Sequence, residues 1–72
     1  MDFGQRLKSL RVERNLTQQN LGDAVGVSTV TIRAWERNTK KPAMDALLSL
    51  GRVLNISMDT LLDFHLNNAP NY

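Results

Sequence analysis

The sequence predicts an all-α domain of five short helices, and three observations lead to this fold class. Apolar residues recur every three or four positions along most of the chain, which is the spacing of one helix face. Residues that favour helix starts and ends punctuate these runs: Thr17, Ser28 and Ser57 before them, and Gly26, Asn38 and Asn55 after them. Only "VSTVTI" is rich in β-branched residues, and its capping serine and the following "RAWERN" favour a helix there too.

The first two helices are expected over residues 2–14 and from residue 18 to residue 25. The apolar face of the first consists of Phe3, Leu7 and Leu10. The segment "RNL" interrupts the pattern, and Thr17 then caps the second helix. Gly26 ends it, because glycine tolerates a positive φ. The residues that the second helix is expected to bury are Leu21, Ala24 and Val25.

The remaining three helices follow the same logic. A third helix is expected from the Ser28 cap to about Arg37, and it places Ile32 and Trp35 on one buried face. The proline in "TKKPA" suits the entrance of a fourth helix, which Asn55 ends. The core face of this helix consists of Leu47, Leu50 and Leu54, and Gly51 lets a neighbour approach closely. Ser57 caps a short fifth helix with Leu61 and Leu62.

Composition excludes several classes of function. Seventy-two residues are enough for one small domain, which we expect over residues 1–66 with a flexible tail over 67–72. The chain has no cysteine and one histidine, so we expect neither disulfides nor a soft-metal site, and no cofactor. No apolar run approaches the roughly 20 residues of a membrane span, and the amino terminus lacks a signal-peptide core. We therefore expect a cytoplasmic protein without a membrane partner.

Positive charge is concentrated in one stretch. The net charge is only +2, but residues 33–41 carry four cations and one anion, whereas residues 44–72 carry one cation and three anions. The four cations are Arg33, Arg37, Lys40 and Lys41. A charged face of this kind is usually only solvated, so the cluster needs support from the neighbouring sequence.

The second and third helices have the spacing of a helix-turn-helix motif, at about residues 18–37. Apolar residues before and after Gly26 would fill the angle between the two helices, and Gly22 is small where they come closest. The segments "LTQQNLGDAVGVSTVTIRAWERN" and "P…LLSLGRVLNISMDTLL" resemble the Xre or Cro/C1 family of phage repressors and bacterial regulators. The resemblance extends from Phe3 to Leu62 and implies a lambda-repressor-like fold and sequence-specific binding of double-stranded DNA. Asn38 replaces the usual glycine and Gly22 the usual alanine.

The outward face of the third helix suits the major groove of DNA. Arginine can donate two hydrogen bonds to guanine, and small apolar groups can contact the thymine methyl. The residues expected to contact bases are Thr29, Val30, Arg33, Ala34 and Arg37. The resemblance also implies phosphate contacts from Gln18, Ser28, Thr31, Asn38, Lys40 and Lys41.

The resemblance further implies an ion pair between Arg11 of the first helix and Glu36 of the third. Trp35 is expected in the core rather than as a stacking platform for single strands, because it shares a face with Ile32. The apolar residues at the carboxy-terminal edge exceed what one short helix can bury, so we expect them to form a two-fold dimer. These residues are Met58, Leu62 and Phe64. Because this patch is small, the chain is expected to pair mainly on operator DNA.

The function expected from these observations is a bacterial or phage-encoded transcriptional regulator at the nucleoid, most simply a repressor of palindromic operators. An activator, a Cro-like antagonist and the amino-terminal part of a longer repressor fit the sequence equally well. A different class of function is a protein-interaction module on the same scaffold, such as the antitoxin of a toxin–antitoxin pair. An enzyme ranks third, because the sequence has no nucleophile–base pair, phosphate loop or metal cluster.

Overall fold

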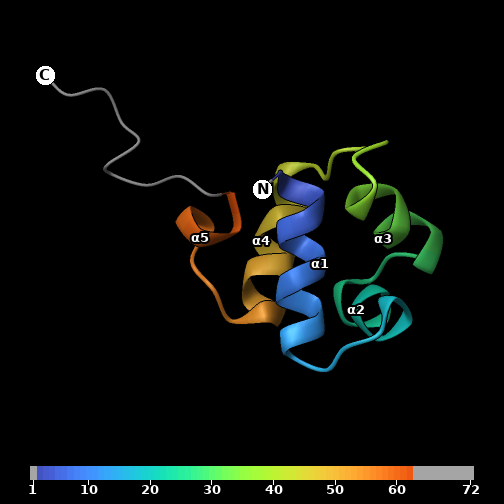
Figure 1. The fold of residues 1–72 in the computed structure, drawn as a ribbon, viewed down its shortest axis with the longest axis horizontal. Helices are drawn as coiled ribbons and strands as arrows, with labels where there is room; N and C mark the ends of the chain where they lie inside the picture. The colour runs from blue at the N-terminus through green and yellow to red at the C-terminus, as the bar shows by residue number, and fades with distance from the viewer. Residues whose placement is uncertain (1, 63–72) are drawn as a thin grey trace, which may run out of the picture.

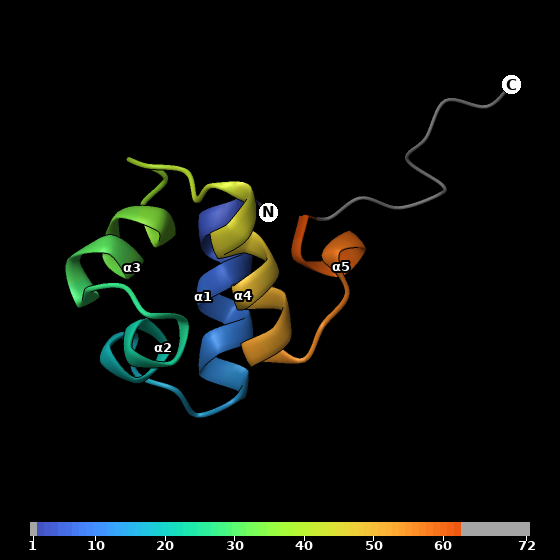
Figure 2. The same cartoon turned by 180° about the vertical axis from the view of Figure 1, so that it is seen from behind.

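The computed structural model describes residues 2–62, and these residues form the five expected helices. The helices are α1 (Phe3–Glu13), α2 (Gln18–Val25), α3 (Thr29–Glu36), α4 (Met44–Leu54) and α5 (Met58–Leu62). In Figure 1, α2 and α3 lie on one side of α1 and α4, and α5 lies on the other. The view from behind shows the same arrangement (Figure 2). The all-α prediction is confirmed, while Phe64 and the tail at 67–72 lie outside the described residues.

Local hydrogen bonds explain where most of the helices begin. The hydroxyl groups of Thr17, Ser28 and Ser57 each accept a hydrogen bond from the backbone N–H three residues later, at 2.9–3.1 Å. These bonds satisfy N–H groups that have no partner within the helix. Asp2 caps α1 in the same way, by accepting from the Gln5 N–H at 2.9 Å. The three predicted caps are therefore confirmed, and Asp2 is a fourth.

The predicted helix ends also adopt the expected backbone conformation. Gly26 follows α2 with φ 81°, and Asn38 and Asn55 follow α3 and α4 with φ 62° and 56°. Asn15 takes the same left-handed conformation after α1, with φ 57°. Asparagine tolerates this region better than other side chains do, so it can replace glycine at these positions.

Three details of the prediction were wrong. Asp2 is the cap of α1 and Glu13 its last residue, so the helix is shorter than the predicted 2–14. Ala24 is exposed, because it lies at a shallow hollow between α2 and α4 rather than under a neighbouring helix. Pro42 precedes Ala43, the residue that caps α4 without a side-chain hydrogen bond, so the proline stands outside the first helical turn.

The core joins side chains from all five helices. Its buried apolar residues are Leu7, Leu21, Ile32, Trp35, Leu50, Leu54 and Leu61. Gly22 is buried where α2 approaches the turn, and a Cβ there would lie 2.7 Å from the carbonyl oxygen of Val27. The close approach expected at Gly22 is confirmed, and it explains why the usual alanine would not fit without a shift. None of the helices within residues 2–62 is long and apolar enough to cross a membrane.

Candidate nucleic-acid interface

The two faces of α3 have opposite environments. Ile32 is fully buried and Trp35 is 5% exposed, so these two side chains fix the helix against the core. Val30 is 68% exposed on the other face, where Arg33 and Arg37 are exposed and Ala34 is half-buried. The core position predicted for Trp35 is confirmed. The outward residues are those that the sequence predicted.

A shallow hollow of about 280 Å³ lies on this outward face. Its lining residues are Val30, Arg33, Ala34, Arg37 and Thr39. Thr29, the remaining predicted base contact, is half-buried at the start of the helix. Sequence reasoning missed Thr39, whose hydroxyl donates to the Ala34 carbonyl at 3.2 Å and so holds the chain against the end of α3. An exposed threonine in a polar connector carries no signal that would have singled it out.

The positive charges on and beside this face are not neutralised within the described residues. Arg33, Arg37, Lys40 and Lys41 are all exposed, and none of them forms an ion pair or side-chain hydrogen bond with residues 2–62. Lys40 and Lys41 belong to the connector between α3 and α4, seen beyond the end of α3 in Figure 1. The face therefore presents four cations to an external partner.

An ion-pair network anchors the carboxy-terminal end of α3. Arg11 Nε donates to Glu36 Oε2 at 2.6 Å and Arg11 Nη2 donates to Glu36 Oε1 at 3.2 Å, with side chains 10% and 4% exposed. The expected pair is present. Gln18 Nε2 donates to the same carboxylate at 3.1 Å, and Arg11 Nη1 donates to the Leu16 carbonyl at 2.8 Å. Glu36 thus joins α1, α2 and α3 at one point.

The start of α1 holds the turn that follows α3. Asn38 Oδ1 accepts from the Gly4 N–H at 3.0 Å. A Cβ on Gly4 would lie 2.8 Å from Asn38 Nδ2 and would collide with the Glu36 carbonyl.

The backbone N–H of Gln5 and, secondarily, the Asn38 side chain lower the pKa of Asp2, because hydrogen bonds to a carboxylate favour its charged form. Sequence reasoning missed both the Gly4–Asn38 hydrogen bond and the Asp2 cap. Only the cap has a local signal, the pattern "DFGQ".

The remaining predicted phosphate ligands already have local partners. The Ser28 and Thr31 hydroxyl oxygens lie 3.0 Å apart, and Ser28 also caps α3. Gln18 shares Glu36 with Arg11, and Asn38 accepts from Gly4. Lys40 and Lys41 differ from these residues, because their ammonium groups form no ion pair or hydrogen bond within residues 2–62.

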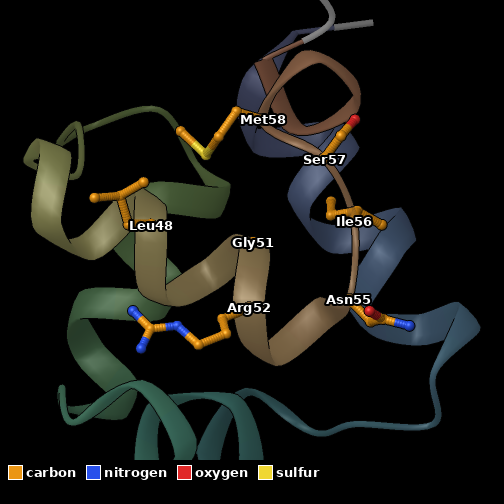
Figure 3. Close-up of a pocket in the computed structure, with 7 residues that line it drawn as sticks. All are labelled: Leu48, Gly51, Arg52, Asn55, Ile56, Ser57 and Met58. Atoms are coloured by element: carbon orange, nitrogen blue, oxygen red, sulfur yellow. The ribbon is translucent and has the colours of Figure 1, made fainter.

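The described residues of the predicted dimer contact, Met58 and Leu62, are the first and last residues of α5. Leu62 is 42% exposed and lines a hollow of about 250 Å³ with Phe3, Pro42 and Leu47 among others. Met58 is half-buried and lines a different hollow, between α4 and the start of α5 (Figure 3). The two residues thus line different hollows from the two ends of one short helix, and Phe64 lies outside the described residues.

Comparison with known proteins identifies the arrangement. The family model described as helix-turn-helix matches residues 7–61. The chain belongs to this family. The repressor protein C2 of Salmonella phage P22 is 41% identical over 60 residues, which are 83% of this chain and 28% of C2. The transcriptional activator BcrR of Enterococcus faecalis is 34% identical over 62 residues, covering 86% of this chain and 30% of BcrR.

Solved structures support the same relationship. The crystal structure of the P22 c2 repressor in complex with a synthetic operator has a TM-score of 0.84 and 37% identity to this helix-turn-helix chain. That match covers 90% of this chain and 98% of the repressor chain. The chain spans about half or less of the length of the curated relatives named above and of other regulators that it resembles.

Proposed function

We propose that this helix-turn-helix chain binds double-stranded DNA in a sequence-specific manner and acts in transcriptional regulation in the cytoplasm. The observation that carries the proposal is the outward face of α3. Arg33 and Arg37 lie there without a partner among residues 2–62, beside the exposed Val30, while the opposite face is fixed in the core. A helix of this kind fits the major groove, where arginine and small apolar groups distinguish base pairs.

The residues of the α3 face have separate tasks in this proposal. Arg33 and Arg37 bind guanine edges, Val30 and Ala34 contact thymine methyl groups, and Thr29 lies at the flank of the groove. Lys40 and Lys41 bind phosphate oxygens, because flexible unpaired ammonium groups are suited to positioning contacts. The remaining N–H groups of Gln18 and Asn38 and the hydroxyls of Ser28 and Thr31 complete the contact to the sugar–phosphate backbone.

A dimer on a palindromic operator follows from the size of one such face. A single α3 is eight residues long, so it reads only a few base pairs. Two copies related by a two-fold axis would place their recognition helices about 34 Å apart, in successive major grooves. We assign the dimer contact on DNA to the carboxy-terminal edge, including Met58, Leu62 and Phe64. Repression is the simplest outcome of such binding, through occupation of the operator.

Selection from a random duplex pool tests the proposal directly. We expect the recovered sequences to share an inverted repeat. If each copy neutralises about three phosphates, the logarithm of the binding constant should fall with the logarithm of salt concentration with a slope of roughly −5. A slope near zero, or a recovered pool without any shared sequence, would contradict the proposal.

A further inference from the structure

The connector between α3 and α4 carries two of the four cations on and beside the α3 face. It extends from residue 37 to residue 43 and contains Lys40 and Lys41, both exposed and without an ion pair among residues 2–62. A lysine on a loose loop loses conformational freedom when it binds a phosphate, and this loss weakens binding. The affinity of these two lysines therefore depends on how firmly the rest of the fold holds the connector.

One attachment of the connector is a single carbonyl oxygen of α3. The Ala34 carbonyl accepts from the Thr39 N–H at 3.0 Å, from the Thr39 hydroxyl at 3.2 Å and from the Lys40 N–H at 3.4 Å. A carbonyl oxygen has two lone pairs, so these three donors share it, and the longest of the three bonds is weak. Bonds that converge on one atom fix the connector at one point and do not prevent it from turning about that point.

The side chain of Asn38 is a second attachment, and it reaches a different helix. Asn38 Oδ1 accepts from the Gly4 N–H at 3.0 Å, and the Asn38 amide also hydrogen-bonds the Asp2 carboxylate. Gly4 is buried in the first turn of α1, where N–H groups have no partner within the helix. Asn38 thus caps α1 from 34 residues away, beside the local cap Asp2. Figure 1 shows the start of α1, at the N label, at the same end of the domain as the connector.

The turn at Asn38 does not itself require an amide side chain. Its φ is 62°, a conformation that glycine adopts without steric cost. A glycine at this position would keep the path of the backbone and would lack the link to α1. The amide therefore contributes something besides the turn, namely the attachment of the connector to a second helix.

We propose that Asn38 is a positioning residue for DNA binding, because its amide fixes the connector to α1 and so holds Lys40 and Lys41 beside the α3 face. The inference rests on the DNA binding proposed above and adds a residue that acts through those lysines. With one attachment at Ala34 and another at Gly4, the connector cannot turn about either point alone. The lysines then lose less freedom when they bind phosphates, which raises affinity without adding a base contact.

Asn38→Gly removes the amide and keeps the turn, and Asn15→Gly is the matched control. Asn15 has φ 57° after α1 and is exposed, and its side chain forms no hydrogen bond within residues 2–62. On the selected operator Asn38→Gly should weaken binding by about three- to tenfold with the same preferred sequence. Asn15→Gly should bind like the wild type. Loss of one part-buried hydrogen bond should leave Asn38→Gly folded at the assay temperature, which thermal melting verifies.

A double-mutant cycle separates positioning from a phosphate contact made by Asn38 itself. If Asn38 acts through the lysines, Asn38→Gly should weaken binding of the Lys40→Ala/Lys41→Ala chain by less than about twofold, because no lysine is left to position. Asn38→Gly should also reduce the steepness of the salt dependence, by up to about one in the logarithmic slope for each lysine that loses its phosphate. A direct contact from the neutral amide would instead give equal losses in both backgrounds and an unchanged slope.

Hydrogen exchange at the Gly4 N–H tests the link without DNA. Asn38→Gly should make this N–H exchange at least about tenfold faster than in the wild type, because its acceptor is gone. Asn15→Gly should leave the exchange rate unchanged. Equal exchange in all three chains would show that the amide does not hold α1, and the inference would then be wrong.

The binding measurements distinguish failure of this inference from failure of the proposed function. Equal losses in the two lysine backgrounds, an unchanged salt slope, or wild-type affinity in Asn38→Gly would each overturn the positioning role. All three results would leave the proposed DNA binding standing. A wild-type chain that binds no duplex would refute the proposed function, and the positioning role with it.

Discussion

Glu36→Gln is expected to destabilise the domain strongly, because Glu36 is the point where three helices are joined. Its carboxylate accepts hydrogen bonds from Arg11 at 2.6 and 3.2 Å and from Gln18 at 3.1 Å, with only 4% of the Glu36 side chain exposed. Glutamine has nearly the same shape but no charge, and it replaces one acceptor oxygen with a donor group. The Arg11 guanidinium, 10% exposed, would then lack its counter-charge.

The size of the effect follows from the burial of the pair. Breaking a buried ion pair by removing one partner costs about 3–5 kcal/mol, because it leaves an uncompensated charge. Glutamine keeps one acceptor for Arg11, so we expect the lower value, about 3 kcal/mol. A domain of this length loses about 4–8 °C in melting temperature for each kcal/mol, which predicts a fall of about 12–24 °C.

Thermal melting followed by circular dichroism measures this change, and Glu13→Gln is the matched control. Glu13 pairs with Arg14 at 3.5 Å, but its side chain is 66% exposed and that of Arg14 31%. Exposed pairs contribute about 0–1 kcal/mol, so this variant should melt close to the wild type. If Glu36→Gln and Glu13→Gln melted within about 4 °C of each other, the buried network would not stabilise the fold as argued.

Three further predictions concern the same region. Gly4→Ala should lower the melting temperature despite the higher helix propensity of alanine, because the added Cβ collides with the Glu36 carbonyl; a higher melting temperature would contradict this. Arg33→Ala should reduce the binding free energy for the best operator by about 1–3 kcal/mol and relax the base preference at one position. Lys40→Ala should instead weaken binding to all sequences alike, and competition binding measures both effects. Asp2→Ala should be less stable than the wild type at neutral pH, and this difference should disappear as pH falls through the lowered pKa of Asp2.

The sign of the Asp2 prediction follows from the direction of its pKa shift. Hydrogen bonds in the folded chain lower the pKa of Asp2, so the unfolded chain binds the proton more readily. The stabilisation is therefore complete above the unfolded pKa and is lost in acid. Melting both proteins from neutral pH to about pH 2 measures it. A difference in melting temperature that persists unchanged in acid would show that the carboxylate charge has no part in the cap.

Local signals allowed the sequence to predict the helices and the outward face of α3. A capping hydroxyl, a helical spacing of apolar residues and an asparagine in the left-handed conformation each act within a few residues. The neighbouring residues in the sequence are therefore sufficient to predict where a helix begins and ends. Ile32 and Trp35 set the phase of α3, and that phase places Val30 and Arg33 outside. Ala24 was wrongly expected in the core because the apolar spacing of α2 continues to it, whereas the hollow beside α4 leaves it exposed.

Contacts between distant segments could not be predicted in the same way. Gly4 and Asn38 are 34 residues apart, and their hydrogen bond exists because α1 packs across the end of α3. The sharing of Glu36 by Arg11 and Gln18 likewise depends on the arrangement of three helices. The resemblance to a family implied the Arg11–Glu36 pair. Residue types and spacing alone do not predict that Gln18 also donates to the Glu36 carboxylate.

The anchoring of α3 separates the stability of the fold from the choice of DNA sequence. Ile32 and Trp35 fix the middle of the helix, and the Glu36 network fixes its end. Val30 and Arg33 contribute neither to the core contacts of α3 nor to the Glu36 network, because Val30 is 68% exposed and Arg33 has no partner among residues 2–62. Substitutions at these two positions can therefore alter base preference at little cost in stability, since exposed residues away from such features usually change it by less than about 0.5 kcal/mol. A fold built in this way can change its operator without having to repack its core.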